Sequence, residues 1–377
     1  MRLLMVSGDR QVAIGERGPL FAMQREFSRH FERIDVLCPR PAGPVVVREI
    51  HGNVFLHPAA CGRAGMVGYI EREGARLLAE HGHALITSHD YGWFYNGIGS
   101  AALSRKSGVP YLSEIHHVPG HPVAAGLRER FDRLVAKRYV RWARSRAAAF
   151  RVVNAGEAKP LLASWGVPQG KILVLPSLYM DLTVFRPAEV APEPEQDVVF
   201  VGRMVANKGL DRIVDALALC AARGNRLRAL FVGKGPLAER TRRRAMARGL
   251  ERDVRFVDWV ASPAELAEVY RKSRAIVCAS TCEGGPRVTV EAMACGTPAV
   301  STPVGMMREL LRQGVNGALC GFDAASLAGG LERVLGDEAA RRRMGEQARR
   351  DVQRFEHAAA IRVYAEGLKR LAGEPIP

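Results

Sequence analysis

The chain has 377 residues, of which 47% are hydrophobic, and its 55 Lys and Arg outnumber its 39 Asp and Glu, giving a net charge of +16. This length exceeds what one hydrophobic core usually organises, which predicts two domains. No stretch approaches the roughly 20 apolar residues of a membrane-spanning helix, so we expect a protein that is soluble or peripheral to a membrane. The apolar start, residues 1–7, is too short for a signal peptide, which predicts a cytoplasmic protein.

The cysteines and the charge limit the classes of partner. Seven cysteines without a Cys-x-x-Cys pair argue against a disulfide framework and against a zinc site. The positive charge indicates an anionic partner, for which nucleic acid, anionic lipid and a nucleotide derivative all qualify. An aromatic content of 7% and the lack of an RNA-binding motif argue against nucleic acid.

Strand-like runs alternate with helical patterns along the chain, which is typical of parallel sheets covered by helices on both faces. The first series of predicted strands covers residues 2–7, 34–39, 84–88, 111–115, 150–153 and 172–175. The second series covers residues 198–201, 230–232, 254–257, 275–279 and 299–301. Prolines interrupt residues 186–196, where we place a linker. The sequence therefore predicts two Rossmann-like, doubly wound α/β domains, residues 1–185 and 197–377, that face a central cleft.

Two features of the first half lie at predicted strand ends. The loop over residues 8–19 contains glycines and precedes a helix predicted over residues 20–31; such loops face ligands in doubly wound sheets, although an ordinary turn is the alternative. His116, His117 and His121 follow the strand at residues 111–115. A histidine there could hydrogen-bond a hydroxyl near a reacting atom, or be an ordinary loop residue. The cluster also suggests a metal, but no carboxylate or Cys pattern accompanies it, so we expect none.

Residues 127–146 are predicted to form a basic amphipathic helix. The apolar residues at helical spacing are Leu127, Phe131, Leu134, Val135, Tyr139 and Trp142. The opposite face carries Arg130, Arg133, Lys137, Arg141 and Arg144. We expect the apolar stripe to pack on its own domain, while the cationic face is either solvated or rests on an anionic membrane.

The strongest chemical signal lies at residues 280–305. A buried strand is predicted to end there at a loop of small residues, and a helix is predicted to begin near Pro286. The free backbone amides and the positive dipole end at the start of this helix favour an anion. Glu283 is predicted in the loop and Glu291 in the helix, and carboxylates accept hydrogen bonds from diols well. The alternative to a binding role is that Glu283 is only an acidic residue at the helix N-terminus and that Glu291 is only a solvated residue of the helix.

These motifs resemble glycosyltransferase family 4, whose members are retaining enzymes with two glutamates in the spacing of Glu283 and Glu291. The resemblance extends from about Pro176 to the C-terminus. It includes Val201-Gly202-Arg203, Asn207-Lys208-Gly209, Gly233-Lys234-Gly235-Pro236, the eight residues from Glu291 to Pro298, and Gly314-Val315-Asn316-Gly317. It implies the GT-B fold, a nucleotide-sugar donor bound by the second domain, an acceptor bound by the first, and a last helix that packs back on the first domain.

The resemblance also implies roles for single residues. Glu291 is expected to bind the donor ribose, Glu283 the transferred sugar, and Gly284 and Gly285 the sugar and phosphates. Arg203 and Lys208 would stabilise the departing diphosphate, since no Asp-x-Asp motif is present to hold a metal. His116 is the expected catalytic histidine, with His117 as the alternative register. Donor contacts are further expected at Gly233 and at the N-terminal loop residues Gly15, Arg17 and Gly18.

The sequence therefore predicts a retaining, metal-independent transferase that uses no cofactor and moves a hexose-type sugar. UDP-sugar is the favoured donor and GDP-sugar the alternative; the acceptor is a glycan, a lipid-linked molecule or a small molecule. Single features of the sequence also fit two other classes of function. Gly233-x-Gly235-x-x-Ala238 after a strand also fits an NAD-type dehydrogenase, but this leaves Arg203 and Glu283 unexplained. The charge alone fits a non-catalytic binder of RNA or lipid.

Overall fold

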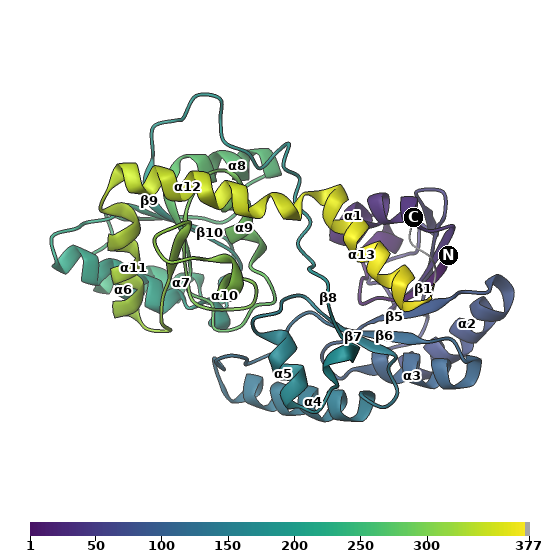
Figure 1. Ribbon diagram of the computed structural model, residues 1–377. Coiled ribbons are helices and arrows are strands. Elements are labelled where there is room, and N and C mark those ends of the chain that lie inside the picture. The colour runs from purple at the N-terminus through teal and green to yellow at the C-terminus, as the bar shows by residue number, and fades with distance from the viewer. Residues whose placement is uncertain (374–377) are drawn as a thin grey trace. The chain divides into compact units, whose positions relative to one another are not determined.

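The computed structural model describes residues 1–373 (Figure 1). Packing divides the chain into two units. The first unit comprises residues 1–118, residues 131–179 and the C-terminal segment from Ala358, and the second comprises residues 119–130 and 180–357. Both are parallel-sheet α/β units, which confirms the predicted fold class.

The first unit contains an eight-stranded sheet in the order β3-β4-β2-β1-β5-β6-β7-β8, parallel except for β3 against β4. Its strands are β1 (Arg2–Val6), β2 (Arg33–Cys38), β3 (Glu49–Ile50), β4 (Val54–Pro58), β5 (Leu85–His89), β6 (Tyr111–Ile115), β7 (Ala149–Val152) and β8 (Ile172–Val174). Its helices are α1 (Pro19–Phe27), α2 (Met66–His81), α3 (Tyr95–Ser107), α4 (Leu127–Ala143), α5 (Ala158–Ser164) and α13 (His357–Leu371), of which α4 begins within residues 119–130.

The second unit contains a six-stranded parallel sheet in the order β11-β10-β9-β12-β13-β14. Its strands are β9 (Gln196–Val201), β10 (Ala229–Val232), β11 (Val254–Val257), β12 (Ser273–Cys278), β13 (Ala299–Ser301) and β14 (Gly317–Leu319). Its helices are α6 (Leu210–Ala222), α7 (Ala238–Ala247), α8 (Pro263–Arg271), α9 (Arg287–Ala294), α10 (Met307–Leu310), α11 (Ala324–Leu335) and α12 (Glu338–Val352). Short 3₁₀ turns are η1 (Val12–Ile14), η2 (Ser28–His30), η3 (Arg63–Gly65), η4 (Gln169–Lys171), η5 (Ala206–Lys208) and η6 (Gln353–Phe355).

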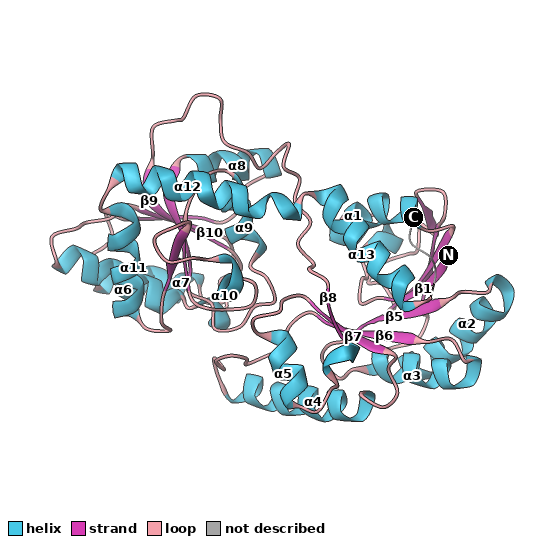
Figure 2. Ribbon diagram, in the orientation of Figure 1, coloured by secondary structure: helices cyan, strands magenta, loops and turns pink. Residues whose placement is uncertain are grey.

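The central strands are apolar in nearly every position because helices cover both faces of each sheet (Figure 2). In β1, Leu3 and Met5 belong to one core cluster, and Leu4 and Val6 belong to another. Alternate residues of a strand point to opposite faces, so the run separates two layers of helices. The C-terminal helix α13 supplies Ile361, Tyr364, Ala365 and Leu368 to the cluster that contains Leu3.

Every strand that the sequence predicts is present, with ends that differ by at most two residues. The sequence did not predict β3, β4 and β14. The helix expected over residues 20–31 ends earlier, at Phe27, and continues as the 3₁₀ turn η2. Between β8 and β9 the described chain forms no helix or strand, and Met180 bridges to Glu356. The second unit thus begins at Met180, before the proline-rich residues 186–196.

Candidate active site

The predicted donor-binding residues of the second unit lie in loops that follow neighbouring strands. Arg203 and Lys208 follow β9, Gly233 follows β10, and Glu283 follows β12. The sheet places these strands side by side in the order β10-β9-β12, all parallel. Their loops therefore emerge at the carboxyl edge of the sheet, where ligands bind in open α/β folds.

The loops after β9 and β12 are joined by direct contacts. The Lys208 ammonium forms an ion pair with Glu283 Oε1, and Ser280 Oγ donates to the same oxygen at 2.9 Å. The backbone N–H of Thr281 donates to the carbonyl of Asn207 at 2.8 Å, and Asn207 Nδ2 donates to the carbonyl of Cys282 at 3.2 Å. Two residues 75 positions apart, a cation and a carboxylate that the sequence assigned to one site, are thus in contact.

Arg203 differs from Lys208 because its side chain is exposed, and its guanidinium donates no hydrogen bond to the described residues and forms no ion pair with them. Its guanidinium remains available to an anion at the same sheet edge. A planar guanidinium with free donors and a nearby ammonium are well suited to two oxygens of a diphosphate.

Glu291 is held inside α9. Its carboxylate is 5% exposed, accepts a hydrogen bond from Arg287 Nε at 2.8 Å and another from the Tyr270 hydroxyl at 3.2 Å. Burial, and then the charge of Glu291, raise the pKa of Tyr270 well above its usual value, so the hydroxyl stays a donor. These contacts fix the orientation of a carboxylate that retains lone pairs for a ligand hydroxyl.

Two glycines let the site loops approach one another closely. Gly233 has φ 142°, and a Cβ there would lie 2.0 Å from the carbonyl oxygen of Gly202. Gly305 has φ 49°, and a Cβ there would lie 2.3 Å from the carbonyl oxygen of Gly284, which accepts a hydrogen bond from Met306 N at 3.1 Å. The loop after β13 thereby supports Gly284 and the adjoining Gly285 ahead of α9.

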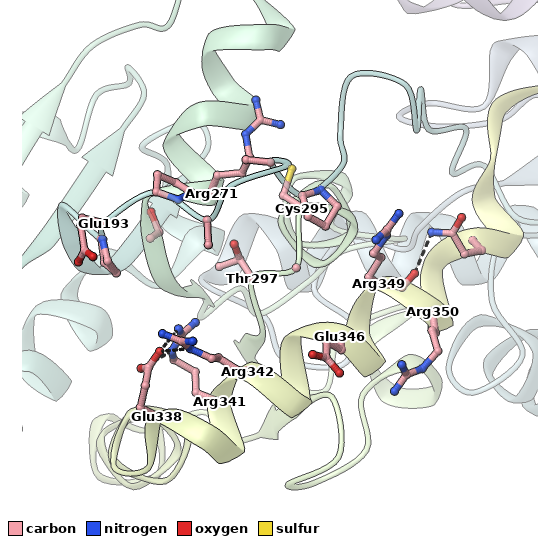
Figure 3. Close-up of a pocket in the computed structure, with 18 residues that line it drawn as sticks. Glu193, Arg271, Cys295, Thr297, Glu338, Arg341, Arg342, Glu346, Arg349 and Arg350 are labelled. Atoms are coloured by element: carbon pink, nitrogen blue, oxygen red, sulfur yellow. Dashed lines mark hydrogen bonds and ion pairs between the residues drawn. The ribbon is translucent and has the colours of Figure 1, made fainter.

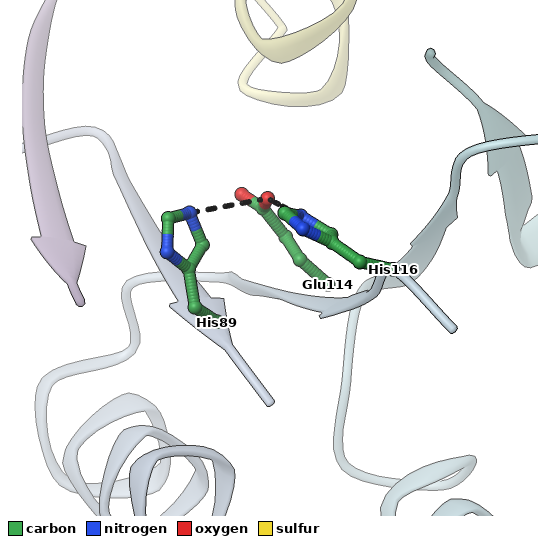
Figure 4. Close-up of side chains that lie close together, drawn as sticks. All are labelled: His89, Glu114 and His116. Atoms are coloured by element: carbon green, nitrogen blue, oxygen red, sulfur yellow. Dashed lines mark hydrogen bonds and ion pairs between the residues drawn. The ribbon is translucent and has the colours of Figure 1, made fainter. Parts of the chain in front are cut away.

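In the first unit, His116 lies just beyond β6 and belongs to a cluster with His89 and Glu114 (Figure 4). Glu114 Oε2 is 3.4 Å from His116 Nε2 and 3.5 Å from His89 Nε2, and the two imidazole centroids are 5.3 Å apart. Burial lowers the pKa of both histidines, that of His89 to about 4, so both rings are neutral near pH 7. A neutral imidazole can donate or accept a hydrogen bond to a substrate hydroxyl.

Glu114 is fully buried and bonded on both oxygens. Arg151 Nη1 donates to Oε2 at 2.7 Å, and the Tyr364 hydroxyl from α13 donates to Oε1 at 2.6 Å. Burial would raise the pKa of Glu114, but the charge of Arg151, followed by the two histidines, lowers it below its usual range. By spacing, His89, Glu114 and His116 could hold a metal ion. The guanidinium of Arg151 already supplies positive charge at this carboxylate, which disfavours a cation there.

Gly15 also lies in the first unit. It ends the turn η1 with φ 89°, and its N–H donates to the carbonyl of Val12 at 3.0 Å. Gly15 and the neighbouring Arg17 are exposed, and Arg17 lies over the ring of Phe21 at 5.5 Å. The turn presents these residues after β1, as expected of a loop at the carboxyl edge of the first sheet.

The sequence missed several residues that shape these sites. Ser280 and Tyr270 position Glu283 and Glu291, and His89 and Arg151 complete the cluster around Glu114. His89 directly follows the strand predicted over residues 84–88 and ends the observed β5, which was a usable signal for a residue at the sheet edge. Tyr270 and Arg151 gave no such signal, because each lies in an otherwise ordinary helix or strand.

The basic helix α4 packs differently from the prediction. Its second half is buried through Ala136, Tyr139 and Val140. Leu127, Phe131 and Leu134 are instead 80%, 53% and 46% exposed, so the expectation that the whole apolar stripe packs on its own domain is wrong for the first two turns. Helical periodicity shows which residues share a face of the helix, and it does not show how much of that face the domain covers. Among the described residues, no helix combines the length and apolar character needed to cross a bilayer.

Comparisons with known proteins agree with this geometry. Residues 183–351 match the family model "Glycosyl transferases group 1", and residues 21–177 match "Glycosyl transferase 4-like domain". A D-inositol 3-phosphate glycosyltransferase of Acidothermus cellulolyticus is 32% identical over 267 residues, which are 66% of this chain and 59% of that protein. The protein of the same name from Frankia alni is 31% identical over 287 residues, 69% of this chain and 68% of that protein.

Solved structures share the fold at low identity. Sucrose-phosphate synthase from Thermosynechococcus elongatus has a TM-score of 0.76 at 22% identity, covering 98% of each chain. Anabaena HepE in complex with UDP and glucose has a TM-score of 0.73 at 20% identity, covering 98% of this chain and 100% of that one. The two family matches and the relative from Frankia alni show that the chain belongs to glycosyltransferase family 4, the glycosyl transferases of group 1.

Proposed function

We propose that this glycosyltransferase moves a hexose-type sugar from a UDP-sugar to its acceptor with retention of configuration and without a metal ion. The observation that carries the proposal is the contact of Lys208 with Glu283 at the sheet edge, together with Arg203 in the same segment after β9, whose guanidinium has no partner among the described residues. Departure of a nucleoside diphosphate develops negative charge, and preorganised cations stabilise such charge strongly. The UDP complex of the Anabaena protein supports UDP as the nucleotide.

The residues take distinct roles in the proposal. Arg203 and Lys208 bind the diphosphate, Gly284 and Gly285 border it, and the positioned carboxylate of Glu291 accepts from the ribose hydroxyls. Glu283 is held by Lys208 and Ser280, which suits a carboxylate that orients the sugar and suits less well a free nucleophile. This favours attack by the acceptor on the face that the diphosphate leaves, without a covalent enzyme intermediate. In the first unit, neutral His116 offers a hydrogen bond to a sugar hydroxyl.

The acceptor is proposed to be a glycan, a lipid-linked molecule or a small molecule. The names of the curated relatives support a small phosphorylated polyol. A second observation supports a membrane-borne acceptor: Trp93 is 68% exposed, and its ring lies 6.3 Å from that of exposed Phe131 at the start of the basic helix α4. We call Trp93, Leu127, Phe131, Leu134 and the cations of α4 the α4 surface. Exposed aromatic residues flanked by arginines are typical of segments that lie on anionic membranes.

Substitution of the donor site tests the proposed function. Arg203→Ala and Lys208→Ala should each lower kcat/KM for the UDP-sugar by about 2 kcal/mol or more, roughly 30-fold, because each removes charge from the leaving group. Glu291→Ala should weaken binding of UDP itself, measured by calorimetry. Arg243→Ala is the matched control, since this α7 side chain is 73% exposed and lies outside the site. Rates and affinities equal to those of the wild type in all three site variants would refute the assignment.

A further inference from the structure

A cavity lies in the second unit (Figure 3). Its volume is about 820 Å³. It is bordered by Ser273 at the amino end of β12, by Cys295 and Gly296 after α9, by residues of the loop 187–194, and by α12. The Lys208–Glu283 pair lies at the opposite, carboxyl end of the same strands. The cavity is therefore separate from the donor site.

The lining is rich in arginine. Arg271, Arg341, Arg342, Arg349 and Arg350 border the cavity, against the carboxylates of Glu193, Glu338 and Glu346. Glu338 is already engaged, since it accepts from Arg341 Nε and Arg342 Nε at 2.9 Å each. This pairing restrains Arg341 and Arg342 on the first turns of α12. In the lining as a whole, the five arginines outnumber the three glutamates, so the cavity carries a net positive charge.

One guanidinium of the lining is open to a ligand. Among the described residues, no side chain or carbonyl bonds the guanidinium of Arg349, which is exposed. Arg271 is engaged instead, since it donates through Nη1 to the carbonyl of Arg186 and through Nη2 to Glu268, both at 2.7 Å. An anion in the cavity would therefore meet Arg349 first.

Two carboxylates in the lining, those of Glu193 and Glu346, offer hydrogen-bond acceptors to a ligand. Glu193 on the proline-rich loop and Glu346 on α12 have no ion pair or hydrogen bond with the described residues. In Figure 3 the two lie on different walls of the cavity, with Glu346 between Arg342 and Arg349 along α12. Free carboxylates accept hydrogen bonds from hydroxyl groups, whereas they repel a phosphate. The cavity thus offers cations for an anionic group and separate acceptors for hydroxyl groups.

We propose that this cavity binds a small molecule that carries both a phosphate and several hydroxyl groups, such as a phosphorylated sugar or polyol. Guanidinium groups match phosphate oxygens in pairs, and the volume is that of a site for a small ligand rather than for a lone ion. The site is distinct from the donor site and does not depend on the function proposed above. A ligand here would touch Arg271, which follows Tyr270, the hydrogen-bond donor to Glu291.

Calorimetry on the full chain tests the proposal, with the donor site saturated by UDP. Glucose 6-phosphate and inorganic phosphate are the probes. The wild type should bind glucose 6-phosphate saturably and more tightly than phosphate, because only the former has hydroxyl groups for Glu193 and Glu346. The double variant Arg342→Gln/Arg349→Gln should bind glucose 6-phosphate about tenfold more weakly or worse. Arg343→Gln, an exposed α12 residue outside the cavity, is the matched control and should bind like the wild type.

Hydrogen exchange locates the bound probe. Glucose 6-phosphate should protect residues 187–194 and 338–353 in the wild type and in Arg343→Gln, and not in the double variant, whose thermal unfolding should match that of the wild type. Equal binding by the double variant and the wild type would place the probe elsewhere and overturn the proposal. So would the absence of saturable binding to the wild type at low salt.

Discussion

Glu114 shows how one buried residue organises the first unit's candidate site. Its carboxylate contacts Arg151 on β7, Tyr364 on α13 and the two imidazoles at the ends of β5 and β6. Arg151 is itself buried and donates to the carbonyls of Leu175 and Pro176, each at 2.9 Å. The Glu114–Arg151 pair thus fixes the carboxylate that His116 contacts. Loss of this pair should lower the free energy of unfolding.

Arg151→Met should destabilise the protein by about 3–5 kcal/mol at pH 7, because it leaves the Glu114 charge buried without a partner. In the wild type the pKa of Glu114 is lowered, so its contribution to stability is present above the unfolded-state pKa and is lost as pH falls. In the variant that pKa rises, so protonation relieves the penalty. The gap between variant and wild type in denaturant unfolding should therefore shrink as pH falls from about 7 to 5.

Tyr364→Phe is the control for this experiment, since it keeps the charge pair and removes one hydrogen bond, at a cost of about 1 kcal/mol. A gap between Arg151→Met and the wild type that stays constant across this pH range would show that the buried charge is not the cause.

The sequence predicted some of the residues at the candidate sites and missed others. The sequence predicted Arg203, Lys208 and Glu283 through motifs that resemble those of the family, and the structure places these residues in segments that follow β9 and β12. Their roles, and that of Glu291, stay predictions. Tyr270 and Ser280, which position the two glutamates, could not be predicted, because a single sequence does not say which side chains meet across neighbouring elements. The same is true of Arg151, whose charge on a predicted strand gave no hint of its partner in Glu114.

At the scale of elements, predictions succeeded where a strand is buried on both faces. Runs such as residues 3–6 of β1 and 198–201 of β9 are apolar throughout and stand out from their surroundings. The missed β14 has three residues and begins with Gly317, where a Cβ would lie 2.2 Å from the carbonyl oxygen of Ala299. It pairs with β13 because the neighbouring strand offers free backbone groups, a tertiary effect that leaves little trace in local sequence.

The helix α4 was identified correctly, but its burial was not. Helical periodicity marks an apolar stripe without showing how much of it the domain covers. The uncovered turns, with Phe131 and neighbouring Trp93, make the α4 surface a candidate for membrane contact.

Sedimentation with liposomes tests the α4 surface. Binding should require anionic lipid and fall as salt rises, because each cation near the surface contributes about 1 kcal/mol that salt screens. The triple variant Lys137→Gln/Arg138→Gln/Arg141→Gln should lose most of this binding, and Phe131→Ser should weaken it at every salt concentration. Removing three α7 charges, Arg240, Arg242 and Arg243, is the control and should change little. Equal binding to neutral vesicles, or none to anionic ones at low salt, would leave a solvated surface and favour a soluble acceptor.

At the scale of the molecule, two parallel α/β units could be predicted because strands and helices alternate in two series separated by prolines. Neither unit, however, is a single continuous segment of the chain. The first unit needs α13 from the far end of the chain, as the hydrogen bond between Tyr364 and Glu114, 250 residues apart, shows. The second unit in turn takes in residues 119–130. Such contacts between distant segments depend on packing, which strand and helix patterns do not encode.

Release of the nucleotide is the measurement that best tests whether the chain transfers a sugar from a UDP-sugar by means of fixed cations. The purified protein is incubated with UDP-, GDP- and ADP-sugars, with and without EDTA, and the released nucleoside diphosphate is measured. Hydrolysis reveals the donor even without the acceptor. We predict release of UDP from a UDP-sugar at a rate that EDTA leaves unchanged and that Lys208→Ala lowers. Release of no nucleoside diphosphate from any donor, or activity that EDTA abolishes and Mg²⁺ or Mn²⁺ restores, would contradict the account.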